Sequence, residues 1–366
     1  MTHVCHITTV HPAADTRILH KECVSLLAAG YDVTLIAPHA QDCVLEGIRV
    51  VALRERARNR LERMARRTQA AYRAAVALDA QLYHFHDPEF LPFGVRLAGA
   101  GKRVVYDAHE DIPVQIRHKD WLPSVARAPA ARACALIESA SIARIDGVVA
   151  VNDDILNRLR RHQPQGVVVT NYPRLDEILP ATGWGERARA ACYVGAITRV
   201  RGARELVDAM AEVAGELHLA GVVSPVALRA ELERSPGWDR VRYLGNLDRR
   251  QVAELLARVK VGVIPLHPIE NYANAYPVKL FEYMAAGIPV VATDVPRWRD
   301  LLETHRCGVC VPHGSPRALA AAITGLLDDD ERARTMGARG RDAALERYSW
   351  ETQATELLRF YDELLA

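Results

Sequence analysis

The chain lacks any uncharged apolar run that approaches the roughly 18 residues needed to span a bilayer. Its first residues also lack the charged and apolar regions of a secretory signal peptide. Neither sign of charge is in clear excess, because 47 Lys and Arg against 45 Asp and Glu leave a formal net charge of +2. So even a balance gives no reason to expect a nucleic-acid partner. We expect a cytoplasmic protein, either soluble or peripheral at the inner face of the membrane.

Two common cofactor and metal motifs are missing as well. No Gly-x-Gly-x-x-Gly turn follows the first predicted strand, which argues against a nicotinamide enzyme. The seven cysteines, an odd number in apolar settings, indicate buried free thiols in a reducing compartment. Cys307 and Cys310 lie near His305 and His313, but the second ligand pair of a zinc site is missing. We therefore expect no cofactor and no metal.

Short apolar runs alternate with amphipathic helical patterns along all 366 residues. Many runs are rich in Val and Ile without strict alternation, as strands buried on both faces are. Such strand–helix alternation predicts an α/β fold with parallel sheets and right-handed crossovers. The predicted strands cover residues 3–8, 32–37, 48–53, 103–107, 147–151, 166–170, 191–195, 216–220, 240–244, 261–265, 289–293 and 308–311.

The length favours two domains over one. A segment at 172–189 contains two prolines and two glycines and has little apolar periodicity, so we place the boundary there. Two Rossmann-like domains facing each other would form a cleft, with functional residues at the carboxyl ends of their strands. The predicted divisions are residues 1–172, residues 173–345, and a C-terminal helix at 346–366 that packs back on the first domain.

The turn after the strand at 191–195 combines basic residues with a helix start. Gly195 ends the strand, and Arg199, Arg201 and Gly202 precede a helical pattern. Free backbone N–H groups at a helix N-terminus favour an anion, and arginine side chains suit phosphate. The turn therefore indicates a phosphate site, with two exposed loop arginines as the alternative.

A second strand–loop–helix unit follows at 261–291. A helix begins near Pro277 and ends at Gly287, with Lys279 in its first turn. A lone cation at that position is unfavourable unless an anion is present. Glu282 lies one turn further on, within reach of a diol such as ribose, although a solvated helix residue is the alternative. The pattern indicates a second contact to the same anionic ligand.

The stretch from Pro277 to Val291 resembles the nucleotide-sugar signature of the retaining glycosyltransferases of family 4, which have the two-domain GT-B fold. The turn at 195–202 resembles the diphosphate turn of these enzymes. Residues 241–246 resemble the loop that contacts the base. In the first half, residues 15–22 and 107–110 match one branch of the family, so the resemblance spans nearly the whole chain.

The resemblance implies metal-independent, retaining transfer of a hexose from a nucleoside diphosphate sugar, with UDP favoured and GDP possible. The acceptor would be a hydroxyl of a glycan, of a lipid-linked molecule or of a small molecule. Two alternatives stay open: a nucleotide-sugar epimerase of the same fold, and a nucleotide-sugar-binding protein with weak catalysis.

The resemblance also assigns roles to residues in both halves. Four would act in catalysis: His109, Arg199, Arg201 and Lys279. The donor would be bound by Gly202, Leu244, Gly245, Asn246, Asn274, Tyr276, Pro277, Val278 and Glu282. The acceptor side would be lined by Asp15, Arg17, His86 and Glu110.

Two positions depart from the family pattern. The family has two glutamates separated by seven residues, but Asn274 stands eight positions before Glu282. The basic residue that usually follows the strand-end glycine is Ala196 here. We expect these changes to alter the preferred donor sugar or to weaken activity.

Two further clusters have competing interpretations. His84, His86 and Asp87 look like metal ligands but are predicted to end a strand at the rim of the cleft. Arginines are dense between Arg54 and Arg73, which predicts either a solvated helix or contact with an anionic membrane surface. The eight arginines are Arg54, Arg56, Arg58, Arg60, Arg63, Arg66, Arg67 and Arg73.

Overall fold

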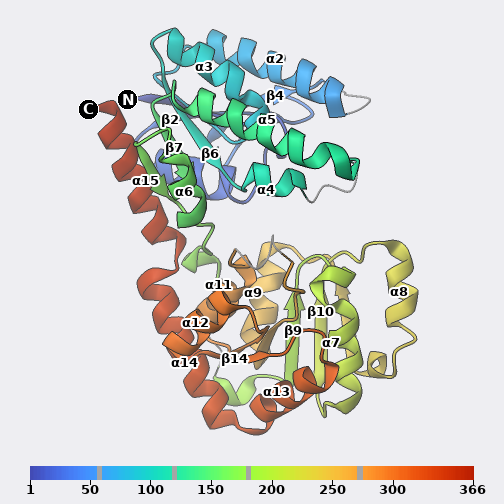
Figure 1. The fold of residues 1–366 in the computed structure, drawn as a ribbon. Coiled ribbons are helices and arrows are strands. Elements are labelled where there is room, and N and C mark those ends of the chain that lie inside the picture. The colour runs from blue at the N-terminus through green and yellow to red at the C-terminus, as the bar shows by residue number, and fades with distance from the viewer. Residues whose placement is uncertain (56–59, 118–121, 179–182, 270–274) are drawn as a thin grey trace. The chain divides into compact units, whose positions relative to one another are not determined.

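The structure, a computed structural model, describes residues 1–55, 60–117, 122–178, 183–269 and 275–366 (Figure 1). The chain forms two compact units. Unit 1 comprises Met1–Asn171 together with Trp350–Ala366, and unit 2 comprises Tyr172–Ser349. Each unit is a mainly parallel sheet covered by helices, which confirms the predicted pair of Rossmann-like domains. The C-terminal helix belongs to unit 1, also as predicted. No described helix is both long and apolar enough to cross a membrane.

The sheet of unit 1 has eight strands among the described residues, in the order β3-β4-β2-β1-β5-β6-β7-β8. All neighbours pair in parallel except β3, which is antiparallel to β4 at the edge. The strands are β1 (His3–Ile7), β2 (Asp32–Pro38), β3 (Cys43–Leu45), β4 (Ile48–Leu53), β5 (Leu82–Phe85), β6 (Arg103–Ala108), β7 (Gly147–Ala150) and β8 (Gly166–Val168).

Helices cover both faces of this sheet and bury two separate hydrophobic clusters. One face carries α2 (Arg60–Leu78), α3 (Leu91–Gly99), α5 (Ser124–Ile142) and α6 (Asp153–Leu159). The short helix α4 (Ile112–Arg117) packs against α5. The other face carries the π-helical turn η1 (Ile18–Cys23), α1 (Val24–Ala28) and the C-terminal helix α15 (Trp350–Leu365).

The sheet of unit 2 has six parallel strands among the described residues, in the order β11-β10-β9-β12-β13-β14. This is the doubly wound order in which the direction of winding reverses between the first and fourth strands. The strands are β9 (Ala190–Val194), β10 (Glu216–Ala220), β11 (Val241–Gly245), β12 (Val261–Ile264), β13 (Val290–Thr293) and β14 (Gly308–Val311).

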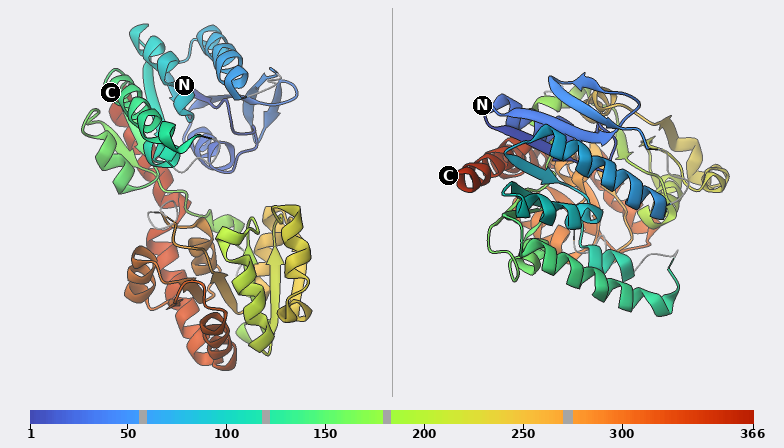
Figure 2. Two further views of the ribbon diagram at one scale, coloured as in Figure 1. Left: turned by 45° about the vertical axis from the view of Figure 1, so that its right-hand side comes forward. Right: turned by 90° about the horizontal axis from the view of Figure 1, so that it is seen from above.

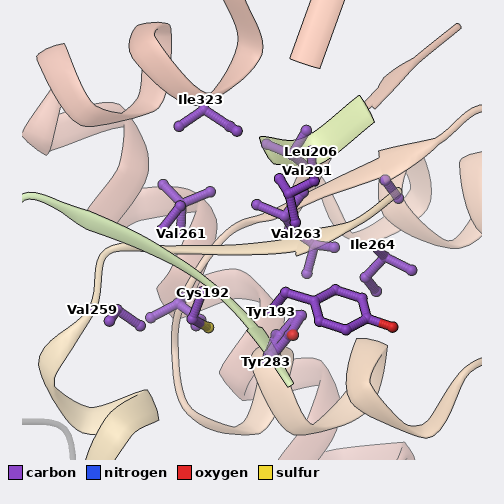
Figure 3. Close-up of a cluster of buried hydrophobic side chains, with 14 of the residues drawn as sticks. Cys192, Tyr193, Leu206, Val259, Val261, Val263, Ile264, Tyr283, Val291 and Ile323 are labelled. Carbon is purple, nitrogen blue, oxygen red and sulfur yellow. The ribbon is translucent and has the colours of Figure 1, made fainter. Parts of the chain in front are cut away.

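One large hydrophobic cluster forms the core of unit 2, and Figure 3 shows part of it. Valines of β12 and β13 pack there beside Tyr193 of β9 and Tyr283 of α11. The helices are α7 (Ala203–Ala209), α8 (Val226–Leu232), α9 (Arg249–Arg258), α11 (Val278–Ala285), α12 (Pro296–His305), α13 (Pro316–Asp328) and α14 (Asp330–Arg347). The core fixes the strand ends from which the candidate site is built.

Candidate functional site

The switch point of the unit 2 sheet lies between β9 and β12, where open α/β sheets bind ligands. The chain leaves β9 at Gly195, whose φ of +128° is a conformation that residues with a side chain rarely adopt. It then forms the short 3₁₀ turn η5 (Arg199–Arg201) and reaches Gly202. A Cβ on Gly202 would lie 2.0 Å from the carbonyl oxygen of Pro265, so only glycine lets this turn pack against the end of β12.

Lys279 and Arg201 meet at the end of β9. A Cβ on Gly195 would lie 3.0 Å from Lys279 Nζ and 3.7 Å from an Arg201 guanidinium nitrogen. Lys279 is in the first turn of α11 and only 8% exposed, with Nζ 3.8 Å from the ring centroid of Tyr193. Its Nζ makes no hydrogen bond to any described residue. Two cationic groups thus converge on one strand end that a glycine leaves open.

Burial lowers the pKa of the Lys279 ammonium to about 7, from an ordinary value of 10.5. The nearby Arg201 charge lowers this pKa further, and the carboxylate of Glu282 opposes the shift. A buried ammonium without a hydrogen-bonded partner is costly, and an anionic ligand would remove that cost. The residues at the end of β9 can therefore bind an anion such as a diphosphate.

Arg199, also expected at this anion, lies elsewhere. Its guanidinium makes an ion pair with Glu231 of α8, and about half of its side chain is exposed. The structure therefore brings Arg201 and Lys279 together but leaves Arg199 out of the pair. The charge of Arg199 is already balanced by the carboxylate of Glu231, so its predicted catalytic role stays a prediction.

The other predicted donor contacts surround the same edge of the sheet. Leu244 and Gly245 end β11, and the neighbouring Tyr243 hydroxyl donates to the carbonyl oxygen of Gly221 at 3.0 Å. Asn246 follows β11 and is exposed. These strand-end positions are available to a ligand.

The start of α11 carries the remaining donor predictions. Tyr276, Pro277 and Val278 are half-buried there, one turn before the half-buried Glu282. Asn274 lies outside the described residues. The assigned roles of all these side chains stay predictions.

In unit 1 the corresponding edge is built around Asp107, at the end of β6. Arg17 donates to both carboxylate oxygens of Asp107 at 3.0 Å each, and to the carbonyl oxygen of Val169 at 2.7 Å. The guanidinium holds the pKa of Asp107 well below its usual range although the group is buried. Arg17 is only 4% exposed, so it holds Asp107 in place rather than lining a binding surface, which corrects the predicted role.

Asp107 also orients two histidines. Its Oδ2 lies 3.0 Å from His109 Nε2 and 3.3 Å from His86 Nδ1. A carboxylate accepts hydrogen bonds only, so it favours the tautomer in which His109 carries its proton on Nε2. In that tautomer Nδ1 can accept a hydrogen bond from a hydroxyl group. His86 is buried, so of the two histidines only His109 can reach a ligand.

A chain of hydrogen bonds continues from His86 into the interior of unit 1. His86 Nε2 lies 3.0 Å from His6 Nδ1, and His6 Nε2 lies 3.2 Å from the hydroxyl of Tyr361 on α15. That hydroxyl is 2.7 Å from His84 Nδ1. With Asp107 as the final acceptor, each bond can point toward Asp107, which leaves His84 Nε2 without a proton and without a partner among the described residues. Burial lowers the pKa of His86 to about 4, so these imidazoles stay neutral near pH 7.

Four of the buried groups could in principle surround a cation. Glu22, His84, His86 and Asp107 offer ligand atoms within 4.8 Å of one another. However, Arg17 Nε lies 2.9 Å from Glu22 and 3.0 Å from Asp107, so a positive charge already contacts both carboxyl groups. A metal ion would be repelled by that guanidinium. The cluster is therefore better described as a polar network that supports His109.

The outer part of the unit 1 edge contains the other predicted acceptor residues. Asp15 accepts backbone hydrogen bonds from Arg17 and Ile18 and lies 3.3 Å from His11 Nδ1. This ion pair raises the pKa of His11. Glu110 is exposed. Sequence reasoning missed His6, Glu22 and Tyr361, since buried polar residues in apolar patterns give no separate signal.

Comparisons with known proteins place both units in one family. Residues 188–329 match the family described as Glycosyl transferases group 1, and residues 16–171 match Glycosyltransferase Family 4. A phosphatidyl-myo-inositol mannosyltransferase of Mycobacterium leprae is 33% identical over 124 residues, which are 34% of this chain and 32% of that protein. The chain thus spans about a third to a half of the first curated relatives that it matches.

Solved structures resemble the fold over the full chain. Sucrose-phosphate synthase of Thermosynechococcus elongatus has a TM-score of 0.79 at 22% identity and covers 100% of this chain and 99% of its own. Anabaena HepE in complex with UDP-glucose has a TM-score of 0.73 at 15% identity, covering 99% and 100%. Both show the GT-B fold seen here. The two family matches together cover most of both units, and the chain belongs to the family 4, group 1 glycosyltransferases.

Proposed function

We propose that this protein is a retaining glycosyltransferase that moves a sugar from a nucleoside diphosphate sugar to an acceptor hydroxyl. The favoured donor is a UDP-sugar, and a GDP-sugar is the second choice. The acceptor is a glycan, a lipid-linked molecule or a small molecule. The observation that carries the proposal is Lys279, a buried ammonium without a hydrogen bond to a described residue, beside Arg201 at an open strand end.

The chemistry follows from where charge develops. When the bond between the sugar C1 and the diphosphate breaks, negative charge grows on the leaving oxygen, and nearby cations lower the barrier. Lys279 and Arg201 supply two such cations. In the same-face route implied by the family, a donor phosphate oxygen takes the acceptor proton as the new C1–O bond forms. His109, with its proton directed at Asp107, would accept a hydrogen bond from a hydroxyl.

The names of similar proteins support a nucleotide-sugar donor. The Anabaena protein is named in complex with UDP-glucose, and the mycobacterial relatives are named as mannosyltransferases that act on phosphatidyl-myo-inositol. The family matches favour transfer over the epimerase alternative. The donor sugar and the acceptor of this chain are left to experiment.

The test compares two equally buried lysines of unit 2. Lys279 and Lys260 are each 8% exposed, but Lys260 has a carboxylate partner, Asp330 Oδ1, at 2.6 Å. Lys279→Met should weaken binding of UDP or GDP and lower the transfer rate by about 10²–10³. It should leave the free protein as stable or more stable, because an unpaired buried charge is removed. Lys260→Met should bind nucleotide normally.

Calorimetric titration with UDP, GDP and ADP, together with thermal unfolding, measures both effects. A donor panel with product analysis then separates transfer from slow hydrolysis and from epimerisation. A wild-type protein indifferent to every nucleoside diphosphate would refute the proposal. Equal nucleotide affinity in both lysine variants would remove Lys279 from the site.

A further inference from the structure

A histidine and a glutamate form a polar pair at the carboxyl edge of the unit 2 sheet. Because all strands of this sheet run in the same direction, their carboxyl ends lie along one edge (Figures 1 and 2). His267 follows β12 there, and Glu205 lies in the first turn of α7. The Nε2 atom of His267 is 3.0 Å from Oε1 of Glu205. We call these two side chains the Glu205–His267 pair.

The pair adjoins the turn that carries Arg201. The backbone N–H of His267 donates to the carbonyl oxygen of Val200 at 2.9 Å, one residue before Arg201. Glu205 lies three residues after Gly202, the glycine that packs against the end of β12. The Glu205–His267 pair is therefore held beside the turn to which the diphosphate is proposed to bind.

Each member of the pair has a second acceptor atom without a hydrogen bond. Glu205 Oε2 is buried and has no partner among the described residues. Because Oε1 of the carboxylate can only accept, it favours the tautomer of His267 with its proton on Nε2, in which Nδ1 is an acceptor. This Nδ1 makes no hydrogen bond to the part of the chain that the structure describes. Two neighbouring acceptors without a donor fit a ligand that supplies O–H groups.

Two structural roles of an acidic residue at a helix start do not account for the pair. Such a residue stabilises the helix dipole, and it can also accept from the N–H of the N-cap residue. Here the N–H of the N-cap residue Gly202 already donates to the carbonyl oxygen of Arg199 at 2.9 Å. The dipole explains a negative charge at Glu205, but it leaves the buried Oε2 without a donor. A buried acceptor without a partner costs stability, and a ligand that donates to it removes that cost.

The ring of His313 packs on His267 and holds its orientation. The two ring centroids are 4.6 Å apart in a T-shaped arrangement. His313 lies between β14 and α13, and α13 packs against α7. The loops after β12 and β14 and the start of α7 thus meet at the pair. Side chains held by rigid elements in this way can distinguish ligands that differ in the position of one group.

We propose that the Glu205–His267 pair binds hydroxyl groups of the donor sugar and so determines which sugar is transferred. The inference rests on the proposed function, because Lys279 and Arg201 would hold the diphosphate nearby. Charge favours the sugar over the phosphates, since a carboxylate repels a diphosphate oxygen but accepts a hydrogen bond from a hydroxyl. A site that bonds a hydroxyl rejects a sugar that lacks it or carries it elsewhere, because the buried acceptors then stay unpaired.

The test separates binding of the nucleotide from binding of the sugar. Calorimetric titration compares UDP with UDP-glucose and UDP-galactose, and GDP with GDP-mannose, for the wild type, Glu205→Gln and His267→Phe. The phenylalanine keeps a ring against His313. Both variants should bind UDP and GDP like the wild type, but should bind the nucleotide sugar that the wild type prefers about tenfold more weakly. The ratio of kcat/KM between that donor and the other sugars should fall by a similar factor.

The matched control is another histidine–glutamate pair of unit 2. His218 Nε2 lies 3.0 Å from Glu216 Oε2, but Glu216 begins β10, at the opposite edge of the sheet. Glu216→Gln should leave the affinity for every donor unchanged. Thermal unfolding shows whether each variant is folded, and normal affinity for the free nucleotide shows that its diphosphate site is intact.

The outcomes separate this inference from the proposed function. Variants that lose affinity for free UDP or GDP would assign the pair to the diphosphate or the ribose and overturn the inference. Variants that keep the sugar preference of the wild type would overturn it as well. A wild type that binds neither nucleotide would refute the proposed function itself.

Discussion

At the scale of single residues, Lys279 links the stability of unit 2 to its proposed ligand. The buried ammonium is disfavoured in the free protein, which lowers its pKa to about 7. Between pH 7 and about 10 the unfolded chain therefore holds a proton that the folded chain has released. Stability of the free protein should rise with pH across this window. A bound diphosphate reverses the preference, because it favours the charged form.

Binding of a nucleotide sugar at pH 8 should therefore take up a proton at Lys279, and at pH 6 it should not. Calorimetric titration in two buffers of different ionisation enthalpy measures this uptake. A nucleotide sugar is preferred to free UDP, because its phosphodiester groups do not titrate in this range. The Lys260→Met variant should show the same uptake as the wild type. A binding enthalpy at pH 8 that does not depend on the buffer would contradict this assignment.

The residues of this site differ in how far the sequence could predict them. Lys279 stood out because a cation in the first turn of a helix opposes the helix dipole. Arg199 and Arg201 looked equivalent in sequence, since both lie in one basic turn. Only the folded chain separates them, because Glu231 reaches Arg199 from a helix that begins 27 residues after it. Pairing between distant elements has no local sequence signal.

At the scale of elements, all six predicted strands of unit 2 are present, but two strands of unit 1 were not identified from apolar runs. Continuous Val and Ile runs identified the buried strands. The strand β5 was predicted only from the polar cluster at its end, because its sequence, Leu-Tyr-His-Phe, has a histidine in place of an apolar residue. The edge strand β3 was missed because three residues are too few to form a pattern. The histidine that interrupts the apolar run of β5 belongs to the polar network that contacts α15.

The network predicts how α15 and unit 1 respond to acid. His6 and His84 have pKa values well below the ordinary value of 6.5, and that of His86 is about 4, mainly because of burial. Their folded pKa values are depressed, so the neutral forms stabilise the fold fully above pH 6.5. That contribution is lost as pH falls from 6.5 toward 4, by up to about 1.4 kcal/mol per histidine and pH unit.

Replacing Tyr361 by Phe tests the same network. The change leaves His6 Nε2 and His84 Nδ1 without their partner, which should destabilise unit 1 by about 1–3 kcal/mol at pH 7. Urea unfolding between about pH 4.5 and 7.5 measures both the cost of the substitution and the loss of stability in acid. Tyr31→Phe, which removes an exposed hydrogen bond to Asp362 on the same helix, is the control and should cost less. Stability independent of pH below 6.5 would show that the histidines titrate normally.

At the scale of the whole molecule, the two units have separate cores, and the chain enters unit 1 twice. Phe360 packs α15 closely against the sheet of unit 1. It is 3% exposed, and a Cβ on Gly147 of β7 would lie 2.6 Å from its ring. The last helix therefore fills a place in unit 1 that only a glycine on the strand allows. Unit 2 is inserted between these two parts and is built from its own residues.

This arrangement predicts that the two units respond separately to perturbation. Phe360→Ala should destabilise unit 1 by about 3–5 kcal/mol, and scanning calorimetry should show its transition at lower temperature. UDP should raise only the transition of unit 2, by mass action on the ligand-bound form. Leu345→Ala, at an exposed position of α14, is the control and should change neither transition. A single transition that Phe360→Ala lowers and UDP raises as a whole would mean that the units unfold cooperatively despite their separate cores.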